Sequence, residues 1–243
     1  KLTMSYGVRY EIFPFPTRED RGLERFDFST GNILACGVGE IPTDCGINVG
    51  ENKFVPRIGL AYRVSDDTVV RVGYGITNDP FNWARPLRTN FPILFAQNFD
   101  GSGFEAGRQL RDGLPVVTEP DLGNGILDLP NNAAVRTFDE NNATRGYIQS
   151  WNFTIEKRVA GWIGSVGYVA TRSVNQLANL EQNYAPIGTG NSGRILANSL
   201  GHLVDVDLFG SLGTAKYDSM QTKLERRFSG GYQLNFAYTW AHG

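Results

Sequence analysis

The segment 54–78 constrains the fold more than any other part of this sequence, because large apolar residues occupy its even positions on both sides of a polar turn at 65–67. A period of two over about ten residues on each side predicts a β-hairpin with one apolar face. Both apolar sets share a face only if the turn holds an odd number of residues, so we expect three, with Val64 opposite Thr68. Each arm also has the ~9–11 residues that a tilted strand needs to cross a bilayer.

The same pattern returns near the end of the sequence. Residues 217–240 alternate on both sides of a Ser-Gly-Gly run at 229–231. Glycine supplies the left-handed backbone conformation that a tight connection requires. A three-residue turn at this point places Phe228 opposite Tyr232.

A third copy lies between these two hairpins. Residues 147–172 alternate around an Ala-Gly pair at 160–161. A two-residue turn there brings Val159 opposite Trp162, a type of cross-strand pair that stabilises a sheet. Residues 2–11 alternate in the same way, so the sequence predicts strands near 2–11, 54–64, 68–78, 147–159, 162–172, 217–228 and 232–240.

Long and short connections alternate along the chain, which places every tight turn at one end of the strands. The long connections are expected to be external loops at 12–53, 79–146 and 173–216. Outer-membrane barrels have this asymmetry, with short periplasmic turns and long external loops. The sequence therefore predicts an all-β fold, an antiparallel up-and-down transmembrane β-barrel segment spanning 1–243. The alternative is a secreted β-sandwich with a polar outer face.

The two faces of the predicted strands differ in chemistry. One face is expected to contact outer-membrane lipid through Tyr6, Leu60, Val72, Phe153, Val166, Leu224 and Phe236. The other face is expected to line a wet lumen with Arg57, Arg71, Asn152, Glu156, Gln221, Glu225, Arg227 and Asn235. Aromatic residues gather at both ends of the strands, as in the girdles of such barrels; these are Trp162 and Tyr232 beside the turns, and Trp151, Tyr238 and Trp240 toward the loops.

Composition agrees with a membrane barrel and excludes other classes. No run approaches the ~18 consecutive apolar residues of a membrane helix, and the mean hydropathy of −0.27 is expected for strands that show lipid only one face. A net charge of −2 provides no basic surface for nucleic acid.

The first long connection contains the only two cysteines, Cys36 and Cys45. We expect them to form a disulfide if this loop faces an oxidising space. Two cysteines alone cannot build a zinc site, so no metal site is predicted.

The three hairpins resemble those of a known family. FVPRIGLAYR with TVVRVGYGITND, YIQSWNFTIEKRV with GSVGYVATRS, and YDSMQTKLERRFSGGYQLNFAYTWAHG are similar, in this order, to barrel hairpins of TonB-dependent receptors of the Oar-like, carboxypeptidase-regulatory-like type. Thr77 stands where that family usually has an aromatic residue. The resemblance implies a plugged barrel of about 22 strands, a bacterial outer-membrane location and energised transport through a TonB-type coupling protein that contacts the plug.

The chain is expected to be a piece of a longer protein, since it lacks the plug. Its strands are too few to close a barrel, because the smallest bacterial barrels have about 8. The edges at 2–11 and 232–240 are therefore expected to pair with the rest of the same polypeptide or with other chains.

Catalytic and cofactor patterns are missing from the sequence. His202 and His242 are the only histidines, and no nucleophile, metalloprotease or phosphate-loop spacing occurs, so we expect neither an enzyme nor a cofactor. Candidate ligand contacts lie at the base of the second loop, where they could equally anchor that loop to the rim; they are Asp79, Trp83, Arg85 and Arg88.

Two functional hypotheses follow from these observations. The first is the barrel portion of an energy-coupled transporter for a large ligand, and the second is a non-transporting β-rich structural or interaction protein of the outer membrane or the extracellular space. The gene sequence upstream would distinguish them, because a plug with a TonB box supports only the first.

Overall fold

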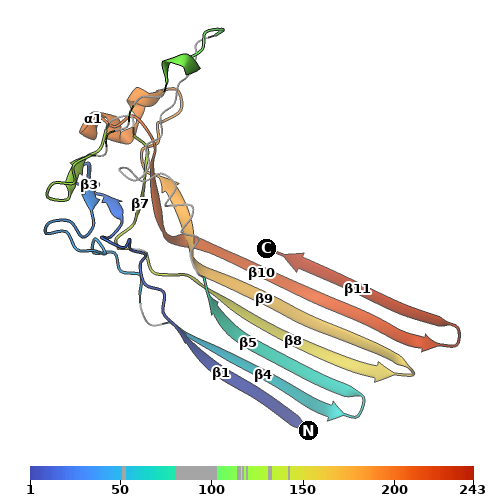
Figure 1. Ribbon diagram of the computed structural model, residues 1–243. Helices are drawn as coiled ribbons and strands as arrows, with labels where there is room; N and C mark the ends of the chain where they lie inside the picture. The colour runs from blue at the N-terminus through green and yellow to red at the C-terminus, as the bar shows by residue number, and fades with distance from the viewer. Residues whose placement is uncertain are drawn as a thin grey trace.

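The fold is dominated by one curved antiparallel sheet. The computed structural model describes residues 1–50, 53–79, 103–113, 116, 118, 120–130, 133–141 and 143–243. Seven long strands follow one another across the sheet in chain order (Figure 1). They are β1 (Leu2–Glu11), β4 (Lys53–Ser65), β5 (Thr68–Asn78), β8 (Tyr147–Val159), β9 (Trp162–Glu181), β10 (Val206–Ser229) and β11 (Tyr232–His242).

The register of the sheet collects the apolar side chains on one face, as the alternation predicts. Leu60 lies opposite Val72, and Val72 lies opposite Phe153 on its other side. At the far side of the sheet, Leu224 lies opposite Phe236. Since directly paired residues point to the same face, one continuous apolar surface runs from strand to strand.

The hairpin connections differ from two of the three predicted turns. Ser65 pairs with Thr68, and Ser229 pairs with Tyr232, so both turns hold two residues rather than three. A register irregularity lies on the strand that leads into each turn, between Arg63 and Ser65 in the first hairpin and between Arg226 and Ser229 in the second. The extra residue is thus taken up by a β-bulge, and the register beyond it is the predicted one. The third turn is as predicted, with Val159 opposite Trp162.

Two strands are much longer than expected. β9 contains 20 residues and β10 contains 24, whereas about 11 are enough to cross the membrane. Their outer parts pair from Ala215 with Ser173 to Asp207 with Glu181. Nearly half of the predicted loop 173–216 is therefore a two-stranded extension of the wall, and residues 182–205 connect its strands.

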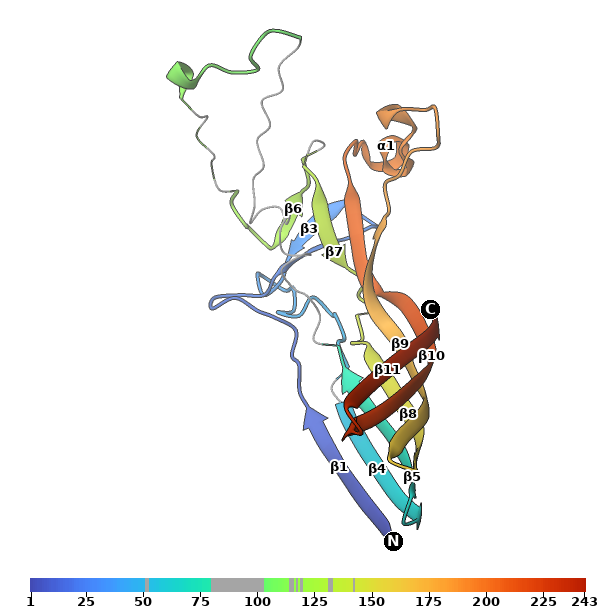
Figure 2. The ribbon, with the colours of Figure 1, turned by 90° about the vertical axis from the view of Figure 1, so that its right-hand side faces the viewer.

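The described parts of the long connections lie beyond this end of the sheet, where their strands and clusters form what we call the outer layer (Figure 2). A small antiparallel sheet has the order β2–β3–β6. A further strand, β7, pairs in parallel with β10, in a wall that is otherwise antiparallel. The bounds of these elements are β2 (Glu24–Phe26), β3 (Asn32–Ala35), β6 (Ile126–Asp128), β7 (Val135–Phe138), η2 (Leu110–Asp112), η3 (Asn191–Gly193) and α1 (Ile195–Leu200).

The buried apolar residues of the described chain lie mostly in this outer layer. One cluster contains Phe15, Phe138 and Phe209, whose rings form a chain with centroids 5.5 and 6.3 Å apart. A second cluster contains Phe26, Ile33 and further residues of the small sheet. Because these side chains come from all three long connections, the layer folds as one unit on the outer part of β10.

The wall carries its large apolar side chains on one exposed face, the face that the sequence predicts to be outward. Tyr6 is 80% exposed and Phe236 is 55% exposed, and most large apolar side chains on the same face are also exposed. An uncovered apolar surface of this extent is typical of a face that contacts another molecule or lipid. No helix in the described parts of the chain is both long and apolar enough to span a membrane.

The sheet is open. Within the described residues, β1 pairs only with β4 and β11 pairs only with β10. Figure 1 shows these two strands on opposite sides of the wall. The structure therefore agrees with the expectation that these residues do not close into a barrel.

The assignment of faces predicts opposite behaviour for two neighbouring positions. In a variant that lacks Cys36 and Cys45, we expect Leu224→Cys to be protected from a water-soluble thiol reagent and Glu225→Cys to react quickly. The measurement is the labelling rate in detergent-free membranes, since lipid covers one face only. Fast labelling at 224 with protection at 225 would show that the faces are reversed.

Candidate functional site

The opposite face of the wall, which is predicted to line the lumen and is here called the inner face, is polar, and some of its charged side chains form ion pairs with one another. Arg71 forms an ion pair with Glu156 at 3.1 Å, and Lys223 forms one with Glu225 at 2.8 Å. These pairs are at least partly exposed, and pairs of this kind add little to stability. They keep charged groups in place along a surface that water can reach.

Small residues on the inner face make room for the long polar side chains. Arg57 lies between Gly7 and Gly75 in the register. A Cβ at Gly73 would lie 2.6 Å from the side-chain nitrogen of Asn152, so that amide lies over the glycine. The glycines inside these strands therefore allow the long side chains of neighbouring strands to lie close to the backbone.

The register places the other predicted lumen residues on this same face. Glu225 lies opposite Asn235, and Gln221 lies opposite Thr239. Arg227 falls within the irregular stretch between Arg226 and Ser229. That this face lines a lumen stays a prediction for these residues.

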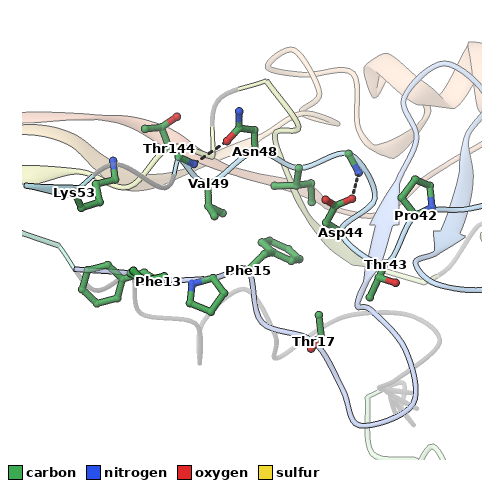
Figure 3. Close-up of a pocket in the computed structure, with 15 residues that line it drawn as sticks. Phe13, Phe15, Thr17, Pro42, Thr43, Asp44, Asn48, Val49, Lys53 and Thr144 are labelled. Carbon is green, nitrogen blue, oxygen red and sulfur yellow. Dashed lines mark hydrogen bonds between the residues drawn. The ribbon is translucent and has the colours of Figure 1, made fainter. Parts of the chain in front are cut away.

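A cavity of about 1020 Å³ lies where β1 and β4 meet the outer layer (Figure 3). Its lining comes mainly from the segment that follows β1 and from the segment that precedes β4, with Lys53 of β4 and Thr144 of the second long connection. Phe13 and Phe15 supply aromatic surface, and Thr17, Asp44 and Lys53 supply polar groups. Its volume is at the upper end of that of small-molecule sites, which also combine apolar walls with a few polar groups.

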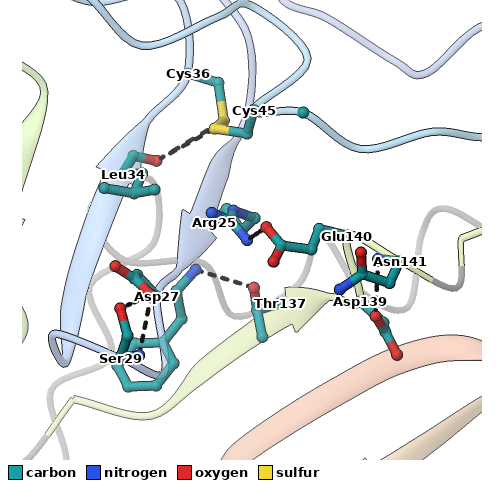
Figure 4. A network of polar contacts seen from close by, with 12 residues as sticks. Arg25, Asp27, Ser29, Leu34, Cys36, Cys45, Thr137, Asp139, Glu140 and Asn141 are labelled. Carbon is teal, nitrogen blue, oxygen red and sulfur yellow. Dashed lines mark hydrogen bonds and ion pairs between the residues drawn. A yellow bond between two sulfur atoms is a disulfide. The ribbon is translucent and has the colours of Figure 1, made fainter.

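Local hydrogen bonds fix the far wall of this cavity. The carboxylate of Asp44 accepts a hydrogen bond from the Gly46 amide at 2.9 Å, and the Asn48 side chain accepts one from the Gly50 amide at 2.8 Å. Such side chain-to-backbone bonds stabilise turns. The predicted disulfide is present between Cys36 and Cys45, and it joins this wall to the end of β3 (Figure 4).

The polar network beneath the disulfide joins the small sheet to β7 (Figure 4). The Phe26 amide donates to the Thr137 hydroxyl at 2.9 Å. Arg25 forms an ion pair with Glu140. Burial raises the pKa of the Glu24 carboxyl, although Arg21 and Arg18 both act against this shift.

Arg145 is a buried cation that contacts two of the residues lining the cavity. Its guanidinium lies 4.5 Å from the centre of the Phe13 ring, and its carbonyl accepts a hydrogen bond from Lys53 at 3.2 Å. Burial lowers the pKa of Arg145, and the nearby charge of Asp79 acts in the opposite direction. The Phe13 ring and the Asp79 carboxylate therefore both stabilise the positive charge of Arg145.

The predicted ligand contacts at the second loop have different outcomes. The Asp79 amide donates to the Gly146 carbonyl at 2.8 Å, and its carboxylate acts on Arg145. These contacts tie the ends of β5 and β8 together, so they support the anchoring role for Asp79. Ligand binding by Asp79 stays a prediction, and Trp83, Arg85 and Arg88 lie outside the described residues.

Sequence reasoning missed Asn183, which organises the connection between β9 and β10. Its side-chain nitrogen donates to the carbonyls of His202 (2.9 Å) and Val204 (2.8 Å). Its side-chain oxygen accepts from the Leu196 amide at 2.8 Å. No spacing in the sequence marks this residue, because its partners are brought together only by the loop itself.

Among the described residues, no group of three or more His, Cys, Asp or Glu side chains is placed to hold a metal ion. The arrangement at the outer end of the wall offers aromatic surface, hydroxyl groups and charges of both signs around an open cavity. These groups can bind a polar ligand with an apolar part.

A family model described as the outer membrane beta barrel domain matches residues 1–243. The chain belongs to this family. Its location is accordingly the bacterial outer membrane, with the three tight turns on the periplasmic side and the outer layer outside the cell.

Comparison with solved structures and with curated proteins adds two findings. The chain is similar to the siderophore receptor PirA from Pseudomonas aeruginosa, with 13% sequence identity and a TM-score of 0.42. The similarity covers 79% of this chain and 28% of that receptor. No curated protein matches the chain.

The outer layer is expected to loosen in mild acid because of His202. Its side chain is buried near the Phe26 ring, and its Nε2 atom has no hydrogen-bond partner. Burial lowers the pKa of this imidazole, and the positive charge of Arg194 lowers it further. Below about pH 6.5 the unfolded segment takes up a proton that the folded one excludes, so stability falls as the pH decreases.

Hydrogen exchange measures this effect directly. Between pH 7.5 and 5.5, we expect protection of the amides in 195–206, corrected for intrinsic rates, to fall by up to about tenfold. His202→Leu should remove the pH dependence, and His242→Leu should leave it unchanged. A dependence that persists in His202→Leu would show that another group is responsible.

Proposed function

We propose that this chain is the barrel portion of an energy-coupled, TonB-dependent outer-membrane transporter for a large ligand, of the Oar-like type that its hairpins resemble. The observation that carries this proposal is the polar inner face, which runs across the long strands and includes the Arg71–Glu156 and Lys223–Glu225 pairs. Charged groups on that face suit a hydrated interior. A purely structural sheet would not need them.

The outer layer supports the same proposal. It is built on the extended β9 and β10 strands and has its own apolar clusters. Beside it, the cavity lined by Phe13, Thr17 and Lys53 is open to the outside. Binding and passage, rather than catalysis, are the activities that we assign to this arrangement, and an oligosaccharide, a peptide or a metal chelate is the proposed class of ligand.

Energised uptake is tested in the bacterium that makes the protein. A strain lacking the gene and its parent are given labelled oligosaccharides, peptides and metal chelates, with and without a protonophore. We expect one class to accumulate only in the parent and only when the membrane is energised. Equal accumulation of every class in both strains would instead support a non-transporting structural protein.

The role of the cavity is tested separately. Thr17 is exposed at its edge, so Thr17→Trp should fill the cavity without removing any described contact. We expect this variant to lower uptake by about tenfold, which corresponds to roughly 1.4 kcal/mol of binding. Glu19→Trp, an exposed neighbour outside the lining, is the control; equal uptake by both variants would exclude the cavity from ligand binding.

A further inference from the structure

A groove of about 630 Å³ lies on the outward, apolar face of the wall, close to the periplasmic turns. Gly164 forms its floor and lies between Lys157 on β8 and Leu224 on β10 in the register. Phe236, opposite Leu224, forms part of the rim. A Cβ at Gly164 would meet only the Leu224 Cδ1 atom, at 3.9 Å, so the floor is open space.

Two cations lie on this same face. Lys157 lines the groove. Arg226 lies two residues nearer the turn than Leu224 on the same strand, and it is opposite Trp162. Its guanidinium is 5.3 Å from the Trp162 ring centre and 4.2 Å from that of Tyr232, and it also donates to the Tyr232 hydroxyl. These aromatic contacts hold Arg226 at the level of the periplasmic membrane interface.

Neither cation forms an ion pair with a carboxylate anywhere in the described chain, where every ion pair involves other residues. A cation on the lipid face is costly unless it reaches the interface or an anion.

The opposite end of the same face has a different arrangement. Arg172 also lies over an aromatic ring, that of Trp151, at 5.2 Å. Yet it forms an ion pair with Asp218 at 2.9 Å. The outer interface therefore places a carboxylate beside Arg172, whose partner in the register is Lys216. In the described chain, the periplasmic interface has no carboxylate paired with Lys157 or Arg226.

We propose that this groove binds an anionic glycerophospholipid of the periplasmic leaflet. Its phosphate contacts Lys157 and Arg226, and one acyl chain lies over Gly164 between Leu224 and Phe236. Lys157 and Arg226 lie on either side of β9, opposite Gly164 and Trp162. Their backbones are therefore about 10 Å apart across the sheet and about 7 Å apart along it, and both side chains are long enough to approach one phosphate beside the turns. That spacing places the phosphate at the turn end of the groove and directs the chain toward the bilayer centre.

The proposal is tested with the whole protein as the cell makes it, extracted into nanodiscs of equal parts phosphatidylglycerol and phosphatidylethanolamine. The lipids that the protein retains after transfer into detergent are counted by native mass spectrometry. We expect phosphatidylglycerol to be enriched among them. Each basic group near a membrane surface raises affinity for anionic lipid by roughly fivefold, so Lys157→Gln with Arg226→Gln should reduce the enrichment about 25-fold.

Matched variants separate this site from general charge effects. Arg158→Gln with Arg63→Gln removes the same charge near the same turns from the inner face, and it should leave the enrichment unchanged. Gly164→Leu keeps both cations but fills the floor, and it should lower retention of phosphatidylglycerol. Equal loss in both double variants, no preference in the parent protein, or a preference for added lipopolysaccharide would each overturn the proposal.

Discussion

Inside a lipid bilayer, every backbone amide and carbonyl must find its partner within the protein, because no water is present to replace it. The ladders from β1 to β11 meet this requirement between neighbouring strands, and only the outer edges of β1 and β11 are left without a partner strand in the described chain. That pairing fixes the register, and the register in turn divides the side chains between two faces. The polar inner face, the apolar outer face and the positions of the interfacial arginines all depend on it.

The same constraint explains why the chain has two kinds of packing. Lipid covers the apolar side chains of the membrane wall, so they need no protein partner. Outside the membrane the chain is surrounded by water, so apolar residues such as Phe138 and Ile33 are buried in clusters of their own. The parallel pairing of β7 with β10 joins these two regions, so the outer layer is attached to a rigid strand rather than to a loop.

Much of the wall could be predicted from the sequence, because strict alternation fixes which residues share a face. The register of all three hairpins followed from parity and turn length, and the disulfide was predicted because the only two cysteines share one loop that was expected to face an oxidising space. The turns at Ser65 and Ser229 could not be predicted fully, because a bulge beside a two-residue turn gives the same parity as a three-residue turn.

The outer layer was mostly beyond prediction. β2, β3, β6 and β7 contain only three or four residues each, too few to show a period. Two register irregularities between Ser211 and Ala215 interrupt the alternation of β10. For this reason the outer part of β10 could not be recognised as a strand from the sequence. The cavity and the Asn183 contacts depend on segments that are distant in sequence, and no local pattern marks them.

The central claim is that these residues form an open section of an outer-membrane wall. Electron cryo-microscopy of the whole protein, purified from its membrane, tests this most directly. The account predicts that Leu2–Glu11 and Tyr232–His242 each form backbone hydrogen bonds with strands from outside the 243 residues. A closed barrel in which these two strands pair directly with each other would contradict it.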